Sequence, residues 1–187
     1  MREMARIYQQ TKHTSHPGLL YYHWSRNNDE SALTRLLALE YTTEVEQSDE
    51  MQFYLASYYI KVDEEKAINF LYNTLALNKA KHEPNPEIYM SLISLFYKHQ
   101  QYKHAYIFAK IAQLSGIEHI DILLIEQQLI AQGKNLESLD RLAEQTLQQI
   151  DQGTFISPPE IINQIQKRQL TLPFCLFFAS AYFDTGF

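Results

Sequence analysis

Apolar residues recur along most of the chain at intervals of three and four positions, which places them on one face of an α-helix. The pattern is clearest in residues 51–77, where two such sets follow one another: Met51, Tyr54, Leu55 and Tyr58, then Ala67, Phe70, Leu71 and Thr74. The polar segment KVDEEK separates the two sets, and its Asp63 stands where a side chain caps the start of the second helix. We therefore predict two antiparallel helices joined by a short turn, a helical hairpin.

The hairpin pattern recurs when Ala67 is aligned with Ala32 and with Ala105, at offsets of about 35 and 38 residues, which are typical of stacked repeats. The first copy contains Leu19, Leu20, His23 and Trp24, followed by the cap Asp29 and by Ala32 and Leu36. The third copy contains Leu92, Ile93, Phe96 and Tyr97, followed by Ala105, Ala109 and Ala112. A weaker fourth copy, residues 118–149, has Ile125, Leu129, Ser138 and Leu142 in these places, with Gly133 closing its first helix.

Helices are also predicted at both ends of the chain. Residues 1–12 have the spacing of an amphipathic helix. From residue 157 the segment SPPE forms a capping box with a proline at the first helical position, which predicts a short helix to Arg168, and a last helix follows from Pro173 to Asp184. We expect residues 1–187 to form a single domain, with an N-terminal helix (1–12), hairpins (14–150) and C-terminal helices (157–187).

The repeats resemble the tetratricopeptide repeat (TPR) family. The residues that carry the resemblance are Met51, Tyr54, Tyr58, Ala67 and Leu71 in the second copy and Tyr89, Leu92, Phe96, Ala105 and Ala112 in the third. Over residues 14–150 it implies an all-α fold, a right-handed α-solenoid of about four TPR-like hairpins. The chain is also similar to uncharacterised bacterial helical-repeat proteins, some of which are lipoproteins.

TPR-like repeats act as protein-binding scaffolds, because their first helices line a concave groove. The groove positions carried over from the family are Tyr21, Trp24 and Ser25; Gln52, Ala56, Tyr59 and Ile60; and Met90, Ser94, Tyr97 and Lys98. From these we predict a peptide-binding groove formed by Tyr21, Trp24, Tyr59, Tyr97 and Lys98, with Lys98 favouring a carboxylate of the partner. Of the adjacent Tyr58 and Tyr59, the first is expected inside the hairpin and the second along the groove or into the next repeat. In the alternative interpretation, Trp24, Tyr59 and Tyr97 only fill the space between neighbouring repeats.

Composition and motifs narrow the function further. The formal net charge of −6 and the lack of a basic face argue against a nucleic-acid partner. The sequence contains no nucleophile elbow, phosphate loop, zinc-protease helix or dinucleotide fingerprint, so we predict a non-enzymatic protein without catalytic residues or cofactors. His13 and His16 have a spacing that suits a metal, but no third ligand accompanies them, and we interpret both as solvated. Cys175 lies in the apolar segment LPFCLFF and is interpreted as a core residue.

The C-terminal helix suggests a second hypothesis. Its large apolar residues favour a structural subunit, a homo-oligomer that self-associates through Phe174, Phe177, Phe178 and Tyr182. The apolar stretch 170–183 is shorter than the roughly 20 residues of a membrane-spanning helix, so no membrane insertion is expected. The chain as given indicates a cytoplasmic protein; a periplasmic or lipid-anchored protein is expected if a leader has been removed.

Overall fold

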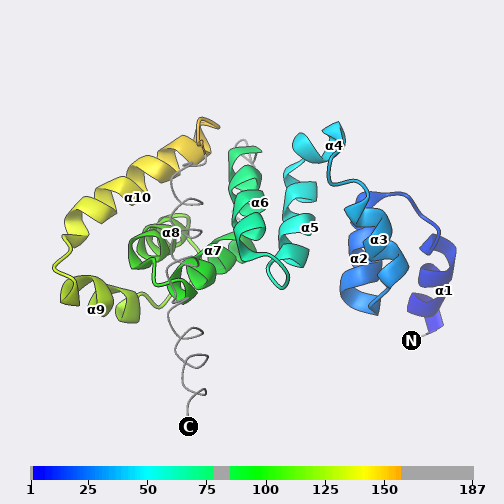
Figure 1. Ribbon diagram of the computed structural model, residues 1–187, viewed down its shortest axis with the longest axis horizontal. Helices are drawn as coiled ribbons and strands as arrows, with labels where there is room; N and C mark the ends of the chain where they lie inside the picture. The colour runs from blue at the N-terminus through cyan, green and yellow to red at the C-terminus, as the bar shows by residue number, and fades with distance from the viewer. Residues whose placement is uncertain (1, 78–84, 157–187) are drawn as a thin grey trace, which may run out of the picture. The chain divides into compact units, whose positions relative to one another are not determined.

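The computed structural model describes residues 2–77 and 85–156, and these residues form an all-α structure of ten helices (Figure 1). They lie in one compact unit, Met1–Ser157. The helices are α1 (Arg2–Thr11), α2 (Pro17–Asn27), α3 (Glu30–Leu37), α4 (Thr43–Glu46), α5 (Asp49–Tyr59), α6 (Glu64–Leu77), α7 (Pro86–Lys98), α8 (Tyr102–Leu114), α9 (Leu123–Ala131) and α10 (Leu136–Asp151). The C-terminal helices predicted from residue 157 onward lie outside the described residues.

Three helical hairpins are among the most extensive helix contacts in the described residues. The pairs α2 and α3, α5 and α6, and α7 and α8 each pack along their length, as the three aligned copies in the sequence predict (Figure 1). The second-helix residues predicted to face the core are buried in all three hairpins: Ala32 and Leu36; Ala67, Phe70, Leu71 and Thr74; and Ala105, Ala109 and Ala112. For the described residues, the prediction of an all-α fold with helical hairpins is therefore confirmed.

The predicted capping residues start the second helices of the first two hairpins. The Asp29 carboxylate accepts a hydrogen bond from the Ala32 amide at 3.0 Å, and Asp63 accepts one from the Lys66 amide at 3.1 Å. Such caps satisfy amide groups that have no partner within the helix. Because each cap fixes where its helix begins, it also fixes which residues of that helix face its partner.

The fourth predicted hairpin differs from the other three in packing and in register. Helix α10 packs mainly on α8 and makes only a small contact with α9. Leu139 and Ala143 are buried, whereas Ser138 and Leu142, the residues predicted for the core, are exposed. A hydrogen bond of 2.9 Å from the Tyr106 hydroxyl to Asp140 joins α8 to α10. The prediction took α9 as the partner of α10, and packing on α8 instead turns the helix by one residue.

An aromatic cluster that the repeat pattern does not predict lies between the second and third hairpins. Tyr72 of α6 contacts Phe96 of α7, Phe108 of α8 and Phe155, which follows α10, with ring centroids 5.7 to 6.3 Å apart. Tyr72 is 1 % exposed, and burial raises the pKa of its hydroxyl strongly. The cluster connects the segment after α10 to the second and third hairpins.

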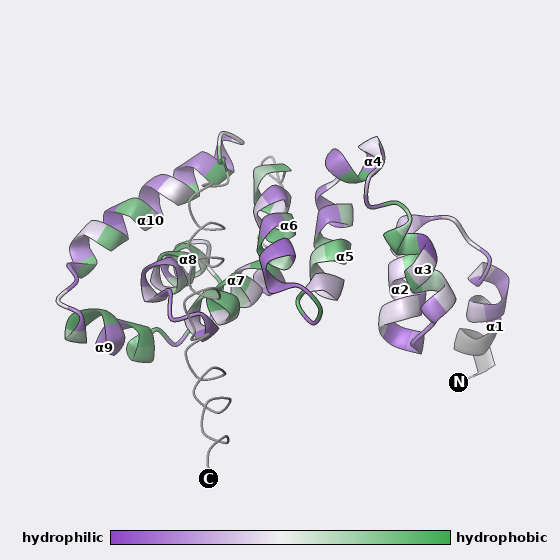
Figure 2. Cartoon of the chain, in the orientation of Figure 1, coloured by the Kyte–Doolittle hydropathy of each residue, from purple (hydrophilic) through white to green (hydrophobic). Residues whose placement is uncertain are grey.

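Helix α9 stands out in the hydropathy pattern. Its residues are apolar over most of its length (Figure 2). Ile125 and Leu129 are buried, but Leu123, Leu124 and Ile130 are 56, 59 and 62 % exposed. The helix therefore has more apolar surface than its described neighbours cover.

Candidate functional site

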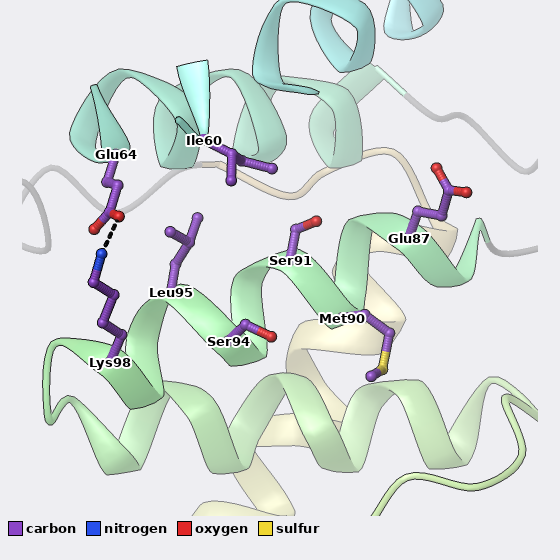
Figure 3. A pocket seen from close by; sticks show the side chains of 8 residues that line it. All are labelled: Ile60, Glu64, Glu87, Met90, Ser91, Ser94, Leu95 and Lys98. Carbon is purple, nitrogen blue, oxygen red and sulfur yellow. Dashed lines mark hydrogen bonds and ion pairs between the residues drawn. The ribbon is translucent and has the colours of Figure 1, made fainter. Parts of the chain in front are cut away.

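A groove of about 520 Å³ lies between the α5–α6 turn and helix α7, and we call it the α7 groove. Figure 3 shows the residues that line it: Ile60, Glu64, Glu87, Met90, Ser91, Ser94, Leu95 and Lys98. Ile60 directly follows α5, Glu64 begins α6, and the other six belong to α7. The groove is therefore formed mainly by the first helix of the third hairpin.

The sequence of α7 places the residues that line the groove on one face of the helix. Its lining residues recur at intervals of one, three and four positions, which is the spacing of one helix face. The helix begins with Pro86 at its first position, and the Asn85 side chain caps it by accepting a hydrogen bond from the Glu87 amide at 3.0 Å. These features place Glu87 in the first turn of α7 and Lys98 at its last residue.

The end of the groove near Lys98 is closed by an ionic cluster. The Lys98 ammonium forms an ion pair with one carboxylate oxygen of Glu64, and the other oxygen contacts His99 Nε2 at 2.7 Å (Figure 3). Burial alone would raise the pKa of Glu64, but the hydrogen bonds from Lys98 and His99 outweigh it, and the pKa of Glu64 is lowered. The prediction that Lys98 binds a partner carboxylate is thus changed, because Glu64 already occupies that place.

The middle of the groove combines apolar and hydroxyl groups. Ile60 and Leu95 face each other across it, and Met90, which is 45 % exposed, lies farther along α7 (Figure 3). Ser91 and Ser94 place their hydroxyls beside these side chains, and neither makes a hydrogen bond within the described part of the chain. The middle of the groove thus offers apolar groups at Ile60 and Leu95 together with two serine hydroxyls.

The predicted groove residues Tyr21 and Trp24 lie elsewhere, in an aromatic row between α2 and α5. Tyr21 stacks on Tyr54 with ring centroids 4.3 Å apart, and Trp24 contacts Tyr58 edge to face at 5.8 Å. These rings pack one hairpin against the next. For Trp24 the geometry matches the alternative interpretation, in which aromatic residues fill the space between repeats, and Tyr21 packs in the same row.

Tyr59 is part of a polar cluster with Glu40 and Lys66. Its ring stacks on Phe70 of α6 at 5.5 Å, its hydroxyl donates to the Glu40 carboxylate, and it accepts a hydrogen bond from Lys66 at 2.8 Å. Tyr58, in contrast, contacts Trp24 of the preceding hairpin. The predicted orientations of the two tyrosines are therefore reversed, because Tyr59 is held inside its hairpin by Phe70 and the ion pair.

The charges of this cluster stabilise one another. Lys66 forms an ion pair with Glu40, and its ammonium lies 4.1 Å from the centre of the Tyr59 ring. Burial would raise the pKa of Glu40, but the hydrogen bonds from Lys66 and Tyr59 lower it. Burial would lower the pKa of Lys66, but the contacts with Glu40 and Tyr59 raise it. The cluster connects the segment after α3 to the second hairpin.

Tyr97 and Lys98 are neighbours in sequence but differ in surroundings. Tyr97 is 38 % exposed and contacts Tyr102 edge to face at 5.4 Å, and it does not line the α7 groove. Of the five predicted groove residues, only Lys98 lines it. The residues predicted for self-association, Phe174, Phe177, Phe178 and Tyr182, lie outside the described residues.

Several lining residues were not among the five predicted site residues. Ile60, Met90 and Ser94 were carried over as groove positions and do line the groove. Glu64 belongs to the predicted turn segment KVDEEK, and Glu87, Ser91 and Leu95 were not singled out. A signal for them exists in the polar residues Glu87, Ser91, Ser94 and Lys98, which form a stripe along an otherwise apolar helix.

Two further features of the described residues concern metal binding and membrane insertion. Across residues 2–77 and 85–156, no three His, Cys, Asp or Glu side chains are grouped closely enough to hold a metal ion. His13 and His16 are both exposed. Within the same residues, every helix is too short or too polar to cross a membrane.

Comparison with known proteins identifies the family. The model of DUF2989, a protein family of unknown function, matches residues 1–110. This region contains α1 to α7, the whole α7 groove and most of α8. Searches of curated proteins and of solved structures each found no match. Because the match covers more than half of the 187 residues, the chain belongs to the DUF2989 family.

Proposed function

We propose that this protein is a non-enzymatic interaction scaffold that binds a segment of a partner protein in the α7 groove. The observation that carries the proposal is the groove itself, a cavity of about 520 Å³ lined by an exposed helix face. We further propose that the hairpins form a TPR-like right-handed α-solenoid. Three packed hairpins and the groove positions Ile60, Met90, Ser94 and Lys98 support this assignment.

The dimensions of the groove suit a peptide. Glu87 and Lys98 are eleven residues apart on α7, which corresponds to about 16 Å at the helical rise of about 1.5 Å per residue. An extended peptide of about five residues covers that length. Apolar side chains would bind beside Ile60 and Leu95, and the hydroxyls of Ser91 and Ser94 would hydrogen-bond to the peptide backbone.

The position of the carboxylates favours binding over catalysis. Glu64 and Glu87 lie at opposite ends of the groove, and Glu64 is held by Lys98 and His99 (Figure 3). Paired carboxylates that act as acid and base face the same reacting atoms. This arrangement instead gives the groove two chemically different ends.

The proposal is tested with a phage-displayed library of random dodecapeptides selected on the immobilised protein. The groove variant is Ser94→Trp, whose indole ring would fill the groove. The matched control is Ser31→Trp, at an exposed position of α3 outside the groove lining. Both variants are first checked for helical content and thermal unfolding, so that a loss of binding is not a loss of fold.

We expect recovered peptides to bind wild type and Ser31→Trp equally, and Ser94→Trp about tenfold more weakly or worse, a loss of about 1.4 kcal/mol. Fluorescence anisotropy with labelled synthetic copies of the peptides measures these affinities. Equal binding to all three proteins would show that the α7 groove is not the site.

Self-association is a second candidate function, and the apolar surface of α9 favours it. Leu123, Leu124 and Ile130 are more than half exposed, and the predicted contact residues Phe174, Phe177, Phe178 and Tyr182 would add to the apolar surface. Light scattering on the purified chain and on a Phe177→Ser, Phe178→Ser variant tests it. If the chain self-associates, wild type should form a larger particle than the variant. If wild type and the variant are both monomeric, this function is excluded.

A further inference from the structure

The two ends of the α7 groove differ in the charge that they offer to a partner. At one end Lys98 and Glu64 neutralise each other in an ion pair, and Glu64 also contacts His99. At the other end Glu87 is exposed, and no side chain in the described part of the chain neutralises it. The formal charge of the lining is therefore −1, and that charge is located at the Glu87 end.

The surroundings of Glu87 leave its carboxylate accessible. It lies in the first turn of α7, where the partial positive charge of the helix end favours a negative side chain. In Figure 3 its side chain extends from α7 at the end of the groove opposite Lys98. The whole chain carries a formal charge of −6, which adds a long-range attraction for cationic partners.

From this charge pattern we propose that the segment bound in the α7 groove carries a lysine or arginine that pairs with Glu87, together with a large apolar residue that binds beside Ile60 and Leu95. This inference rests on the proposed function and adds the chemical class of the partner. In this proposal Lys98, paired with Glu64, closes one end of the groove and does not contact a partner carboxylate.

The spacing within the partner follows from α7. Leu95 is eight residues from Glu87 on α7, which is about 12 Å, and an extended chain covers that distance in three or four residues. The cationic residue and the apolar residue are thus expected about three or four positions apart in an extended partner. The serine hydroxyls face the backbone between them.

The test compares selections of the dodecapeptide library on wild type and on Glu87→Arg. Glu87→Gln serves as a second variant that removes the charge without placing a cation at the start of α7. Glu144→Arg, at an exposed position of α10 outside the groove lining, gives the same change in net charge as Glu87→Arg. Selected peptides are then synthesised in pairs that differ only by Glu in place of the lysine or arginine.

We expect wild type and Glu144→Arg to select peptides with lysine or arginine about three or four positions from a large apolar residue. We expect Glu87→Arg to bind these peptides about three- to tenfold more weakly at low salt and to prefer their Glu counterparts. Glu87→Gln should lose the preference between the two members of a pair.

The outcomes separate the two proposals. Peptides that bind wild type but not Ser94→Trp would show that the groove binds peptides. If the same peptides show no preference for lysine or arginine over Glu, or a preference that is unchanged in Glu87→Arg, the cationic partner is ruled out. If no peptide depends on Ser94, the proposed function fails, and the inference about the partner fails with it.

Discussion

The hydroxyl of Tyr59 lies between a carboxylate and an ammonium group, and this position explains why an aromatic residue with a polar tip occurs there. It donates to Glu40 and accepts from Lys66, while the ring stacks on Phe70. Glu40 is 9 % exposed, and a charge so well buried requires both a counterion and hydrogen bonds. Residue Tyr59 thus stabilises the second hairpin through contacts that a phenylalanine reproduces only in part.

Replacing Tyr59 by phenylalanine tests this role. We expect Tyr59→Phe to lower the free energy of unfolding by about 1 to 2 kcal/mol, because Glu40 and Lys66 each lose a hydrogen bond while the ring is retained. Urea denaturation followed by circular dichroism measures the change. Tyr97→Phe is the control, because within the described residues the Tyr97 hydroxyl makes no hydrogen bond, and its effect should stay within about 0.5 kcal/mol. Equal effects would contradict the role assigned to the polar cluster.

The Glu40 carboxylate also predicts a dependence of stability on pH. Its pKa in the folded chain is lowered from the ordinary value of 4.5, so ionised Glu40 stabilises the fold above about pH 4.5. That contribution is lost as the pH falls through the lowered pKa. Glu40→Gln should therefore be less stable than wild type by about 1 to 3 kcal/mol at pH 7, with the difference shrinking toward pH 3.

Comparing the two proteins isolates Glu40 from other acids. The pKa values of Asp29 and Glu64 are also lowered, so wild type and Glu40→Gln both lose stability in acid. Only the difference between their free energies of unfolding reports on Glu40. A difference that is the same at pH 7 and pH 3 would show that the charge of Glu40 contributes nothing.

At the scale of single elements, helix pairs were predictable wherever a cap and an apolar face agree. The helix α6 has both, because Asp63 caps it and Ala67 and Leu71 repeat at helical spacing. The helix α10 was predicted as the second helix of the fourth copy, but one residue out of register. Periodicity shows that a helix has an apolar face, but which neighbour buries that face depends on contacts between distant residues, such as Tyr106 and Asp140.

The register of α10 predicts that substitutions of Leu139 and of Leu142 change the stability of the fold by different amounts. Leu139→Ala should lower the free energy of unfolding by about 2 to 3 kcal/mol, because Leu139 is 8 % exposed and its loss leaves a cavity. Leu142→Ala should cost less than about 1 kcal/mol, because Leu142 is 44 % exposed. Chemical denaturation of both variants measures the two effects. A larger loss for Leu142→Ala would restore the register predicted from sequence.

For the whole molecule, the sequence predicts the helices that form a groove more accurately than it predicts the side chains that line it. Ile60, Met90, Ser94 and Lys98 follow from repeat positions, but the pairing of Lys98 with Glu64 depends on how one hairpin packs on the next. The same holds for Trp24, whose exposure depends on Tyr58 of another hairpin. Contacts within a hairpin are local in sequence, whereas contacts between hairpins depend on packing that no short pattern encodes.

The extent of the folding unit gives a prediction for the whole molecule. The family match ends at residue 110, inside α8, whereas the compact unit extends to Ser157. A chain shortened to residues 1–110 lacks Ile111 and Ala112, which are fully buried, and lacks α10, which packs on α8. It also lacks Phe155, whose ring stacks on Tyr72. We expect residues 1–157 to unfold in one cooperative transition and residues 1–110 to show no such transition.

Urea denaturation followed by circular dichroism compares the two shortened chains. The steepness of unfolding depends on the surface that becomes exposed, so a cooperative core gives a sharp transition and a loosened one a gradual change. If residues 1–110 unfold as sharply as residues 1–157, the contacts of α8 with α10 and of Tyr72 with Phe155 add nothing to the core. The α7 groove would then be supported entirely by the region that matches the DUF2989 family model.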